Sequence, residues 1–383
     1  MVLTKGQEQG LRVAVERYRN NEPYTVIAGY AGTGKSTLIP YIVDALNIPE
    51  DRVVFATLTG KAALVLRNKG CQNSMTLHKL LYIPKKIPNT NDVEFVPRTY
   101  LEDPPKLIVV DEASMVSQEI FDLLMSHKIY TIFLGDTFQL PAISNSANIL
   151  DHPHVMLTEI TRQALDSPII RLSMDIREFK PLVYGGPKEA RIMSREKVSK
   201  GLLLGADIVL CGKNITRRSL NKEIRKLKWE DKYKEGPING DRLICLKNYW
   251  DKTDLLDETP LLNGMLGTLS NVKTYDTKLL HPKLTATFTN ETGDVFDYNK
   301  FSIDYQLLTT GEPTVNNETW KKFYKKEKPL EFDYGYTITT HKSQGSQFNR
   351  VLCFVERMGD KESFYRWLYT SVTRSVEKVV LVD

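Results

Sequence analysis

The stretch Gly29-Tyr30-Ala31-Gly32-Thr33-Gly34-Lys35-Ser36 fits the pattern GxxxxGK(S/T). It follows the short apolar run Tyr24–Ala28 and opens a segment with helical character. Between a strand and a helix, this pattern forms a loop whose backbone N–H groups surround phosphate oxygens, and the helix N-terminus adds favourable partial charge. The sequence therefore predicts a phosphate-binding loop after the first strand.

Particular residues of this loop have expected parts in binding a nucleoside triphosphate. Lys35 would reach the β- and γ-phosphates, and Ser36 would be a ligand of Mg²⁺. Pro40 lies just past the first turn, where it should bend the helix slightly. The other residues expected to line the nucleotide are Gly29, Gly32, Thr33, Gly34 and Thr37.

A second motif, Leu107-Ile108-Val109-Val110-Asp111-Glu112, is an apolar strand that ends in two carboxylates. Adjacent acids at a strand end are often only a solvated turn. With a phosphate loop upstream, we expect Asp111 to be a second ligand of the metal and Glu112 to polarise an attacking water. The two motifs together predict hydrolysis of a nucleoside triphosphate, but they leave open what the hydrolysis drives.

The pattern of apolar runs predicts an α/β fold. Four short runs rich in β-branched or aromatic residues alternate with helical stretches in the first third of the chain, as buried parallel strands do. These runs are Tyr24–Ala28, Val53–Ala56, Leu107–Val110 and Tyr130–Leu134. A second α/β pattern begins near Leu157 and includes a predicted strand at Ile208–Cys211, a helix at Ile215–Trp229, and strands at Val351–Val355 and Val379–Val382.

Two segments depart from this alternation. Residues 82–104 contain four prolines and are followed by Pro105, which excludes a long helix, and two short runs there flank Asn89-Thr90-Asn91-Asp92, a plausible hairpin turn. From about 251 to 330 the pattern becomes β, with a second hairpin predicted from Leu284 to Tyr298.

Composition excludes several classes of protein. Of the 383 residues, 41% are hydrophobic and 26% charged, which argues against a mainly disordered chain. No uncharged apolar run approaches a membrane span and the N-terminus lacks an apolar signal core, so we expect a soluble cytoplasmic protein. The four cysteines are scattered and the histidines show no metal-ligand spacing, which argues against a zinc site or a disulfide scaffold. The net charge of +5 permits an anionic partner without requiring one.

Four further segments resemble the motifs of a known family. In chain order they are Gly135–Pro141 (GDTFQLP), Leu157–Gln163 (LTEITRQ), Thr339–Ser346 (TTHKSQGS) and Tyr369–Arg374 (YTSVTR). With the two motifs above, this set resembles the superfamily 1 DNA helicases, in the RecD-like branch that includes the phage Dda helicase. The resemblance extends from Gln7 to Arg374 and implies two RecA-like parallel-sheet domains.

The resemblance also implies a division of the chain. Residues 1–155 would form the first RecA-like domain, with a strand-separating pin inserted at 82–104. Residues 156–250 and 331–383 would form the second, with an SH3-like β insertion at 251–330. Two departures, Leu58 and Ala142 in place of prolines common in the family, put only local loop shape in doubt.

The resemblance assigns parts to residues around the nucleotide. Gln7 resembles the glutamine that recognises adenine, and Gln139 the sensor that links the γ-phosphate to DNA. Arg162 and Arg374 resemble two arginine fingers of the second domain, and a finger is worth roughly a thousandfold or more in turnover. Gln344 and Gly345 resemble the loop that closes over the phosphate.

DNA contacts are also implied, through side chains that suit phosphate contact without reading bases. In the first domain the matching residues are Thr59, Lys61 and His78, although a buried, satisfied histidine is an alternative for His78. Phe95 is the expected wedge residue of the pin. In the second domain the matching residues are Thr339, His341 and Lys342.

The resemblance implies an ATP-dependent DNA helicase that uses Mg²⁺ and moves 5′ to 3′ on single-stranded DNA. Expected partners are single-stranded and fork DNA and a single-strand binding protein or replisome component, with the chain a monomer in the cytoplasm, that of the host if the source is a phage. Replication, repair and recombination all remain open. So do two rivals: a translocase that strips proteins from single strands and unwinds poorly, and a binding module whose ATP site only switches affinity.

Overall fold

The computed structural model describes residues 3–68, 70–86, 93–141, 147–253, 260–275, 283–291, 293–297, 303–312 and 329–383. The chain divides into two compact units. Unit 1 comprises Met1–Ile83, Phe95–Arg195 and Ser343–Asp383, and unit 2 comprises Pro84–Glu94 and Glu196–Lys342.

A six-stranded parallel sheet is the centre of unit 1. Its strand order is β3-β2-β6-β7-β1-β8. The bounds are β1 Tyr24–Gly29, β2 Val53–Thr57, β3 Ser74–Thr76, β6 Leu107–Val110, β7 Thr131–Gly135 and β8 Val155–Leu157. The four strands predicted from the apolar runs are confirmed, and so is their parallel pairing. β8 pairs with β1, so this sheet continues to Leu157, past the expected domain boundary at 155.

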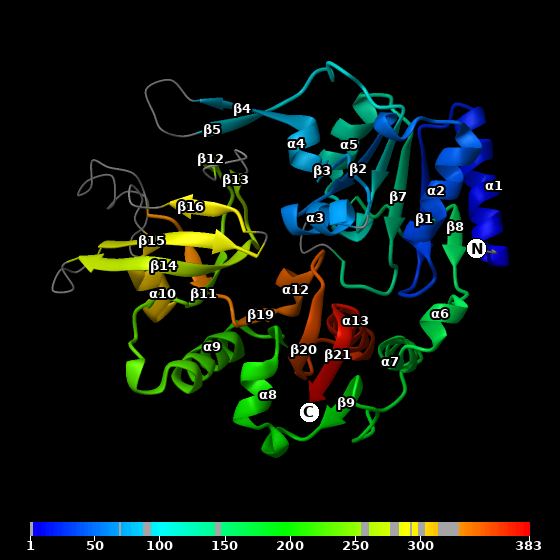
Figure 1. Cartoon of the computed structure of the whole chain (residues 1–383). Helices are drawn as coiled ribbons and strands as arrows, with labels where there is room; N and C mark the ends of the chain where they lie inside the picture. The colour runs from blue at the N-terminus through cyan, green and yellow to red at the C-terminus, as the bar shows by residue number, and fades with distance from the viewer. Residues whose placement is uncertain are drawn as a thin grey trace. The chain divides into compact units, whose positions relative to one another are not determined.

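Helices cover both faces of this sheet because successive strand residues point to opposite sides. Ile27 of β1 packs in a cluster with α1 (Lys5–Arg19) and α2 (Lys35–Leu46), which lie side by side next to β1 in Figure 1. Val26, one residue earlier, packs in a second cluster with α4 (Leu77–Leu81) and α5 (Gln118–Ser126). The shorter elements of unit 1 are η1 Glu50–Arg52, α3 Gly60–Asn68, η2 Ala113–Met115 and α6 Arg162–Leu165. A further helix, α7 (Pro168–Arg177), packs against β9, β21 and α13, which are described next.

A second set of parallel strands is divided between the two units. In unit 1, β21 (Ser375–Val382) pairs with β20 (Phe348–Phe354) and with β9 (Ala190–Met193), and α13 (Lys361–Val372) precedes β21. In unit 2, β10 (Ile208–Cys211) pairs with β19 (Thr337–Thr339). The helices of this part are η3 Arg195–Lys197, α8 Lys200–Gly205, α9 Asn214–Trp229, η4 Glu230–Lys232 and α12 Thr340–Ser343. The predicted α/β class is confirmed.

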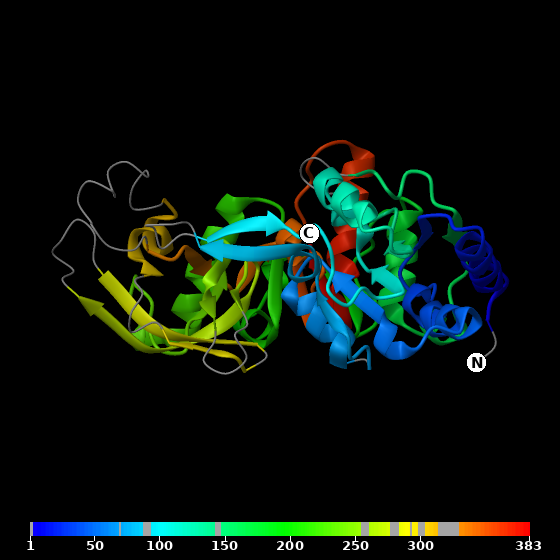
Figure 2. The same cartoon turned by 90° about the horizontal axis from the view of Figure 1, so that it is seen from above.

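Unit 2 also contains an antiparallel sheet with its own apolar core. Its order is β16-β15-β14-β11-β18, and β17 pairs with β15. β14 and β15 are the long yellow ribbons in Figure 2, and the predicted hairpin is confirmed by Phe288↔Phe296 pairing of β15 with β16. The bounds are β11 Arg242–Cys245, β14 Leu266–Tyr275, β15 Lys283–Asn290, β16 Val295–Asp297, β17 Ile303–Asp304 and β18 Phe332–Tyr334, with α10 at Tyr305–Thr310.

β11 and β18 lie outside the predicted insertion at 251–330, so this sheet takes strands from both of its flanks. Two smaller pairs complete the β structure. β12 (Tyr249–Thr253) pairs with β13 (Pro260–Leu261), and β4 (Tyr82–Lys86) pairs with β5 (Val93–Pro97). The second pair falls in the predicted pin, whose turn Asn89–Asp92 is outside the described residues.

Within the described residues, no helix is long and apolar enough to cross a membrane. None of the four cysteines, all of which are among the described residues, forms a disulfide bond. In the same part of the chain, no group of three or more His, Cys, Asp or Glu side chains is placed to hold a metal ion.

Candidate active site

The glycine-rich loop joins β1 to α2 as predicted. β1 ends at Gly29 and α2 begins at Lys35. Gly32 and Gly34 have φ angles of 79° and 75°, in the left-handed region that glycine enters without steric cost. The pattern therefore places its glycines where the turn needs them.

The ammonium group of Lys35 closes this loop on itself. Its Nζ donates to the carbonyl oxygens of Gly29 at 2.8 Å and Tyr30 at 3.0 Å. The Thr33 hydroxyl donates to the same Tyr30 oxygen at 2.9 Å. Ser36 and Thr37 are exposed in the first turn of α2, where their hydroxyl groups are accessible.

The two acids after β6 have different settings. Asp111 is half-buried, and its Oδ1 accepts a hydrogen bond from the Glu112 backbone N–H at 2.9 Å. Glu112 has a φ angle of 55°, a left-handed conformation that is costly for a residue with a Cβ atom. Such backbone strain concentrates at functional sites.

Arg374, from the far end of the chain, meets Glu112. Arg374 is buried, and its Nη1 lies 3.3 Å from Glu112 Oε1. Its guanidinium also donates to the carbonyl oxygens of Thr370 and Ser346 at 3.2 and 3.4 Å. The structure thus brings together two predicted catalytic residues that are 262 positions apart.

The loop after β7 holds a buried carboxylate, Asp136, and the predicted sensor, Gln139. Burial raises the pKa of Asp136, while the nearby Lys35 ammonium and the hydrogen bond from Tyr369 oppose that rise. Gln139 is buried, and its side-chain oxygen has no hydrogen-bond partner among the described residues. A buried acceptor left without a partner is rare in proteins and marks a place where a ligand or water can bind.

α13 binds this loop through three side chains. The Tyr369 hydroxyl donates to Asp136 Oδ2 at 2.7 Å and accepts from the Ala31 backbone N–H of the phosphate loop at 2.8 Å. The Thr370 hydroxyl accepts from the Leu140 N–H at 2.9 Å, and Arg366 donates to the Thr137 carbonyl oxygen at 2.7 Å.

These contacts join residues that the sequence analysis did not connect. Tyr369 and Asp136 each belong to a motif quoted above. No local sequence signal indicated that the Tyr369 hydroxyl would hydrogen-bond both Asp136 and Ala31 of the phosphate loop.

Gln344 and Gly345 also lie beside this site. The buried Gln344 amide donates to the Leu140 carbonyl oxygen at 2.7 Å. Gly345 has a φ angle of 71°, and a Cβ atom there would lie 3.2 Å from the Thr59 hydroxyl. Thr59, a predicted DNA contact, accepts from the Ala62 N–H at 3.2 Å at the start of α3.

Gln7 is buried against the phosphate loop. Its amide nitrogen donates to the carbonyl oxygens of Thr33 and Gly34 at 3.2 and 3.4 Å. Its amide oxygen accepts from the Thr4 N–H at 2.9 Å, which completes a capping box at the start of α1. In this conformation the amide is engaged at both ends.

Arg162 differs from Arg374. It is exposed at the start of α6, and it makes no hydrogen bond or ion pair with the described residues. Its neighbour Thr161 does contact the phosphate loop, since its N–H donates to the Gly32 carbonyl oxygen at 3.0 Å. Arg162 therefore follows a residue that contacts the phosphate loop, but its guanidinium forms no ion pair with Asp111 or Glu112.

The remaining predicted DNA contacts of unit 1 have mixed settings. His78 is half-buried on α4 and stacks on Tyr82, with ring centroids 5.6 Å apart, and burial lowers its pKa. Lys61 lies on α3, and its side chain is outside the described structure. Phe95 is half-buried and packs against the cluster under α4 and α5. This packing argues against Phe95 as an exposed wedge.

Three predicted DNA contacts belong to unit 2. Thr339 ends β19, and its hydroxyl accepts from the Lys342 N–H at 3.4 Å. Burial lowers the pKa of His341. The pKa of Lys342 is also lowered, by desolvation and by the Arg217 guanidinium. The Asp333 carboxylate, which forms an ion pair with Arg217, opposes this lowering of the Lys342 pKa.

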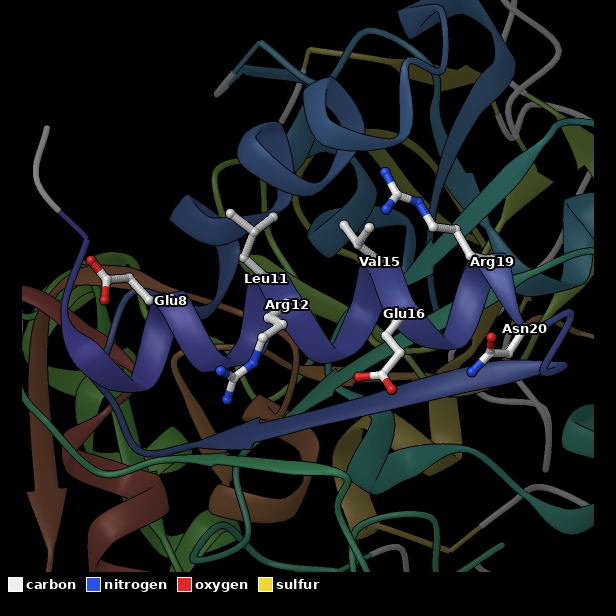
Figure 3. A pocket seen from close by; sticks show the side chains of 7 residues that line it. All are labelled: Glu8, Leu11, Arg12, Val15, Glu16, Arg19 and Asn20. Atoms are coloured by element: carbon white, nitrogen blue, oxygen red, sulfur yellow. The ribbon is translucent and has the colours of Figure 1, made fainter.

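A shallow pocket lies apart from these residues, on the outer face of α1. Figure 3 shows two apolar side chains, Leu11 and Val15, among charged and polar ones of the same helix. Gln7, Gly10 and Ala14 are the buried residues of α1, so Gln7 faces the domain rather than this pocket.

Comparison with known proteins matches two families. Residues 2–184 match the AAA domain family, and residues 334–382 match the UvrD-like helicase C-terminal domain. The ATP-dependent DNA helicase Dda of Enterobacteria phage T4 is 25% identical over 46% of this chain. The ATP-dependent RecD2 DNA helicase of Deinococcus radiodurans is 24% identical over 92% of it. Together these matches support a superfamily 1 helicase of the Dda and RecD type.

The chain spans 43% of the Dda sequence and 46% of the RecD2 sequence, less than half of either. An uncharacterised protein of Acanthamoeba polyphaga mimivirus is 24% identical and matches over 94% of this chain and 95% of its own length. Among solved structures, Bacteroides Pif1 bound to ssDNA has a TM-score of 0.54 at 19% identity, covering 100% of this chain and 92% of that one. The fold of two RecA-like domains is thereby confirmed.

Proposed function

We propose that this chain is an ATP-dependent DNA helicase that moves 5′ to 3′ on single-stranded DNA and separates duplex strands. The observation that carries the proposal is the contact between Arg374 and Glu112. An arginine finger acts by stabilising charge on the transferring phosphoryl group, and a carboxylate acts by orienting the attacking water. The proposal is supported by Asp136, whose carboxyl group interacts electrostatically with both Lys35 of the phosphate loop and Glu112.

The residues around the loop suit ATP and Mg²⁺. Mg²⁺ prefers oxygen ligands and is held by one or two protein groups together with substrate phosphates. The Ser36 hydroxyl and the Asp111 carboxylate are such groups, so a dedicated cluster of acids is not needed. When bound, the metal would neutralise charge on the phosphates. Lys35 would exchange its two carbonyl contacts for phosphate oxygens.

Gln139 would report the phosphate to the rest of the protein. Its free side-chain oxygen can accept a hydrogen bond from the attacking water, and Gln344, bound to the same loop, would close over the phosphate. Arg162 would join them only when the segment after Thr161 moves, which makes hydrolysis conditional on closure of the two RecA-like domains.

We assign the domains as the family resemblance implies, with a pin at 82–104 and an SH3-like insertion at 251–330. Thr59, Lys61, His78, Thr339, His341 and Lys342 are the proposed contacts to the DNA backbone. Single-stranded and fork DNA are the proposed substrates, and a single-strand binding protein or replisome component is the proposed partner of the monomer.

A second candidate is a single-stranded DNA translocase with little intrinsic unwinding. The packing of Phe95 favours it, because a half-buried side chain that packs against its own domain is less available to wedge between base pairs. The same ATP site would serve both activities.

The test is strand displacement on two partial duplexes, one with a 5′ tail and one with a 3′ tail, with ATP and Mg²⁺ and with Lys35→Ala as the blank. Unwinding only from the 5′ tail is the expected result, and unwinding only from the 3′ tail would overturn the polarity. DNA-stimulated hydrolysis without unwinding would select the translocase. The proposal itself would be refuted if the chain did not hydrolyse ATP, or if its hydrolysis were unchanged in Lys35→Ala.

A further inference from the structure

The main chain around the predicted sensor, Gln139, is held by hydrogen bonds on both sides. The Leu140 N–H donates to the Thr370 hydroxyl at 2.9 Å, and the Leu140 carbonyl oxygen accepts from the Gln344 amide at 2.7 Å. The Gln139 N–H donates to the Asp136 carbonyl oxygen at 3.2 Å. The Gln139 side-chain oxygen, in contrast, is buried and has no partner among the described residues. The main chain is therefore fixed while the side-chain oxygen is left for a ligand or water.

The direction of the bond between Leu140 and Thr370 is set by the groups that it joins. The backbone nitrogen of Leu140 can only donate, so the Thr370 oxygen accepts. The one hydroxyl proton of Thr370 goes to the Arg366 carbonyl oxygen, 2.8 Å away in the same helix. Thr370 and Leu140 are both buried, so water does not readily replace the bond between them. Thr370→Val would leave the Leu140 N–H without an acceptor, and an unsatisfied buried donor is costly.

Thr370 also contacts the predicted arginine finger. Its carbonyl oxygen accepts from Arg374 Nε at 3.2 Å, and Arg374 Nη1 lies 3.3 Å from Glu112 Oε1. The N–H that the Thr370 hydroxyl binds belongs to the planar peptide group that joins Gln139 to Leu140. Holding this group restricts rotation about the Cα–C bond of Gln139. One residue of α13 therefore holds the finger through its main chain and the sensor loop through its side chain.

We infer that Thr370 is a positioning residue that sets the side chain of Gln139 relative to Arg374. The inference rests on the proposed function, in which Gln139 accepts a hydrogen bond from the attacking water and Arg374 stabilises charge on the phosphoryl group. A misplacement of about 1 Å caused by a mutation away from the chemistry can cost about a hundredfold in rate. Loss of the Thr370 hydroxyl should therefore lower turnover while ATP binding is unchanged.

The first test measures ATP hydrolysis by the full chain with saturating single-stranded DNA. Thr370→Val keeps the shape of the side chain and removes the hydroxyl. We expect kcat to fall about tenfold with KM for ATP unchanged, as for one hydrogen bond lost at a buried site. Thr370→Ser keeps the hydroxyl and should retain nearly full turnover. Thr131→Val is the matched control, because it removes a buried hydroxyl that donates to the Ile129 carbonyl oxygen at the start of β7, and its turnover should be unchanged.

A double-mutant cycle decides whether Thr370 acts through Gln139. Gln139→Met removes the sensor amide and should lower kcat by more than Thr370→Val does. In that background Thr370→Val should cost less than about a further twofold, because no sensor is left to misplace. A full second tenfold loss would overturn the inference. So would unchanged kcat in Thr370→Val, an equal loss in Thr131→Val, or a loss in Thr370→Ser as large as in Thr370→Val.

A second measurement does not depend on hydrolysis. The side-chain amide signals of Gln139 are recorded by NMR in protein made with isotope-labelled glutamine, and they are assigned as the signals that Gln139→Met lacks. Thr370→Val should shift or split them and Thr131→Val should not, and signals that do not move in Thr370→Val would overturn the inference. If the unaltered chain hydrolyses no ATP, the proposed function fails, while this comparison still decides whether Thr370 positions Gln139. If Thr370→Val does not fold, Thr370→Cys replaces it in both tests, because a thiol of similar size is only a weak acceptor.

Discussion

The hydroxyl of Tyr369 joins α13 to two parts of the candidate site, and Tyr369→Phe removes that hydroxyl alone. The ring keeps its edge-on contact with Phe138, whose centroid lies 5.2 Å away. What disappears is a hydrogen bond to the Asp136 carboxylate at 2.7 Å and one from the Ala31 N–H at 2.8 Å. The side chain is buried, so water cannot readily replace either bond.

The expected cost depends on the charge of Asp136. A hydrogen bond to an ionised group contributes about 1.5–3 kcal/mol, and one between neutral groups about 1 kcal/mol. With the neutral bond from Ala31 also lost, the total should be about 2.5–4 kcal/mol in the free energy of unfolding where Asp136 is ionised. Where Asp136 is protonated, both lost bonds are neutral and the loss should be nearer about 2 kcal/mol.

The direction of the pH dependence follows from the pKa of Asp136. Burial raises it in the folded protein above the ordinary value of 3.8, so the contribution of Asp136 to stability falls as pH rises through the folded pKa. Tyr369 opposes the rise, and its loss raises the pKa of Asp136 further. The gap between the unaltered protein and the variant should widen with pH.

The assay is urea unfolding from about pH 5 to about pH 8.5. Tyr365→Phe is the control, because it removes a hydroxyl from the same helix that donates to the neutral Lys180 carbonyl oxygen at 3.0 Å. The control should lose about 1 kcal/mol at every pH. Equal and pH-independent losses in the two variants would refute the reasoning about Tyr369 and Asp136.

Two further predictions concern charged side chains. Arg374→Ala should leave ATP binding nearly intact while turnover falls roughly a thousandfold or more, measured by equilibrium binding and single-turnover hydrolysis, and equal losses in both would make the residue structural. Arg225→Ala breaks a buried ion pair with Asp241 at 2.8 Å and should cost about 3–5 kcal/mol in thermal unfolding. Lys200→Ala breaks an exposed pair and should cost less than about 1 kcal/mol, so similar losses would contradict the assignment of Arg225.

The central strands could be predicted because their signal is local. β1, β2, β6 and β7 are short runs of apolar residues buried on both faces, and each carries its own evidence in four to six consecutive residues. The phosphate loop is equally local. β8 and β11 were not identified, since three or four residues give little periodicity and their pairing partners are distant in sequence.

Contacts within the site were less accessible to sequence reasoning. Thr4-x-x-Gln7 has the spacing of a capping box, a signal that could have indicated one half of the Gln7 contact. The other half depends on tertiary packing. The Tyr369 hydroxyl meets partners 338 and 233 positions away, and no pattern within a motif specifies such a pairing. The packing of the half-buried Phe95 against its own domain is likewise a property of the folded chain.

The pairing of β9 with β21 has a consequence for how the protein is made. Ala190 pairs with Val379, so β9 leaves the ribosome about 190 residues before its partner. Until β21 has been synthesised, one edge of β9 has no strand to pair with. The loop after β7 likewise has no α13 to bind it. Pairing between strands so distant in sequence slows folding. An unpaired strand edge can also pair with strands of other chains, which leads to aggregation. We therefore expect the yield of folded protein to depend on chaperones and on the rate of translation between Met193 and Ser375.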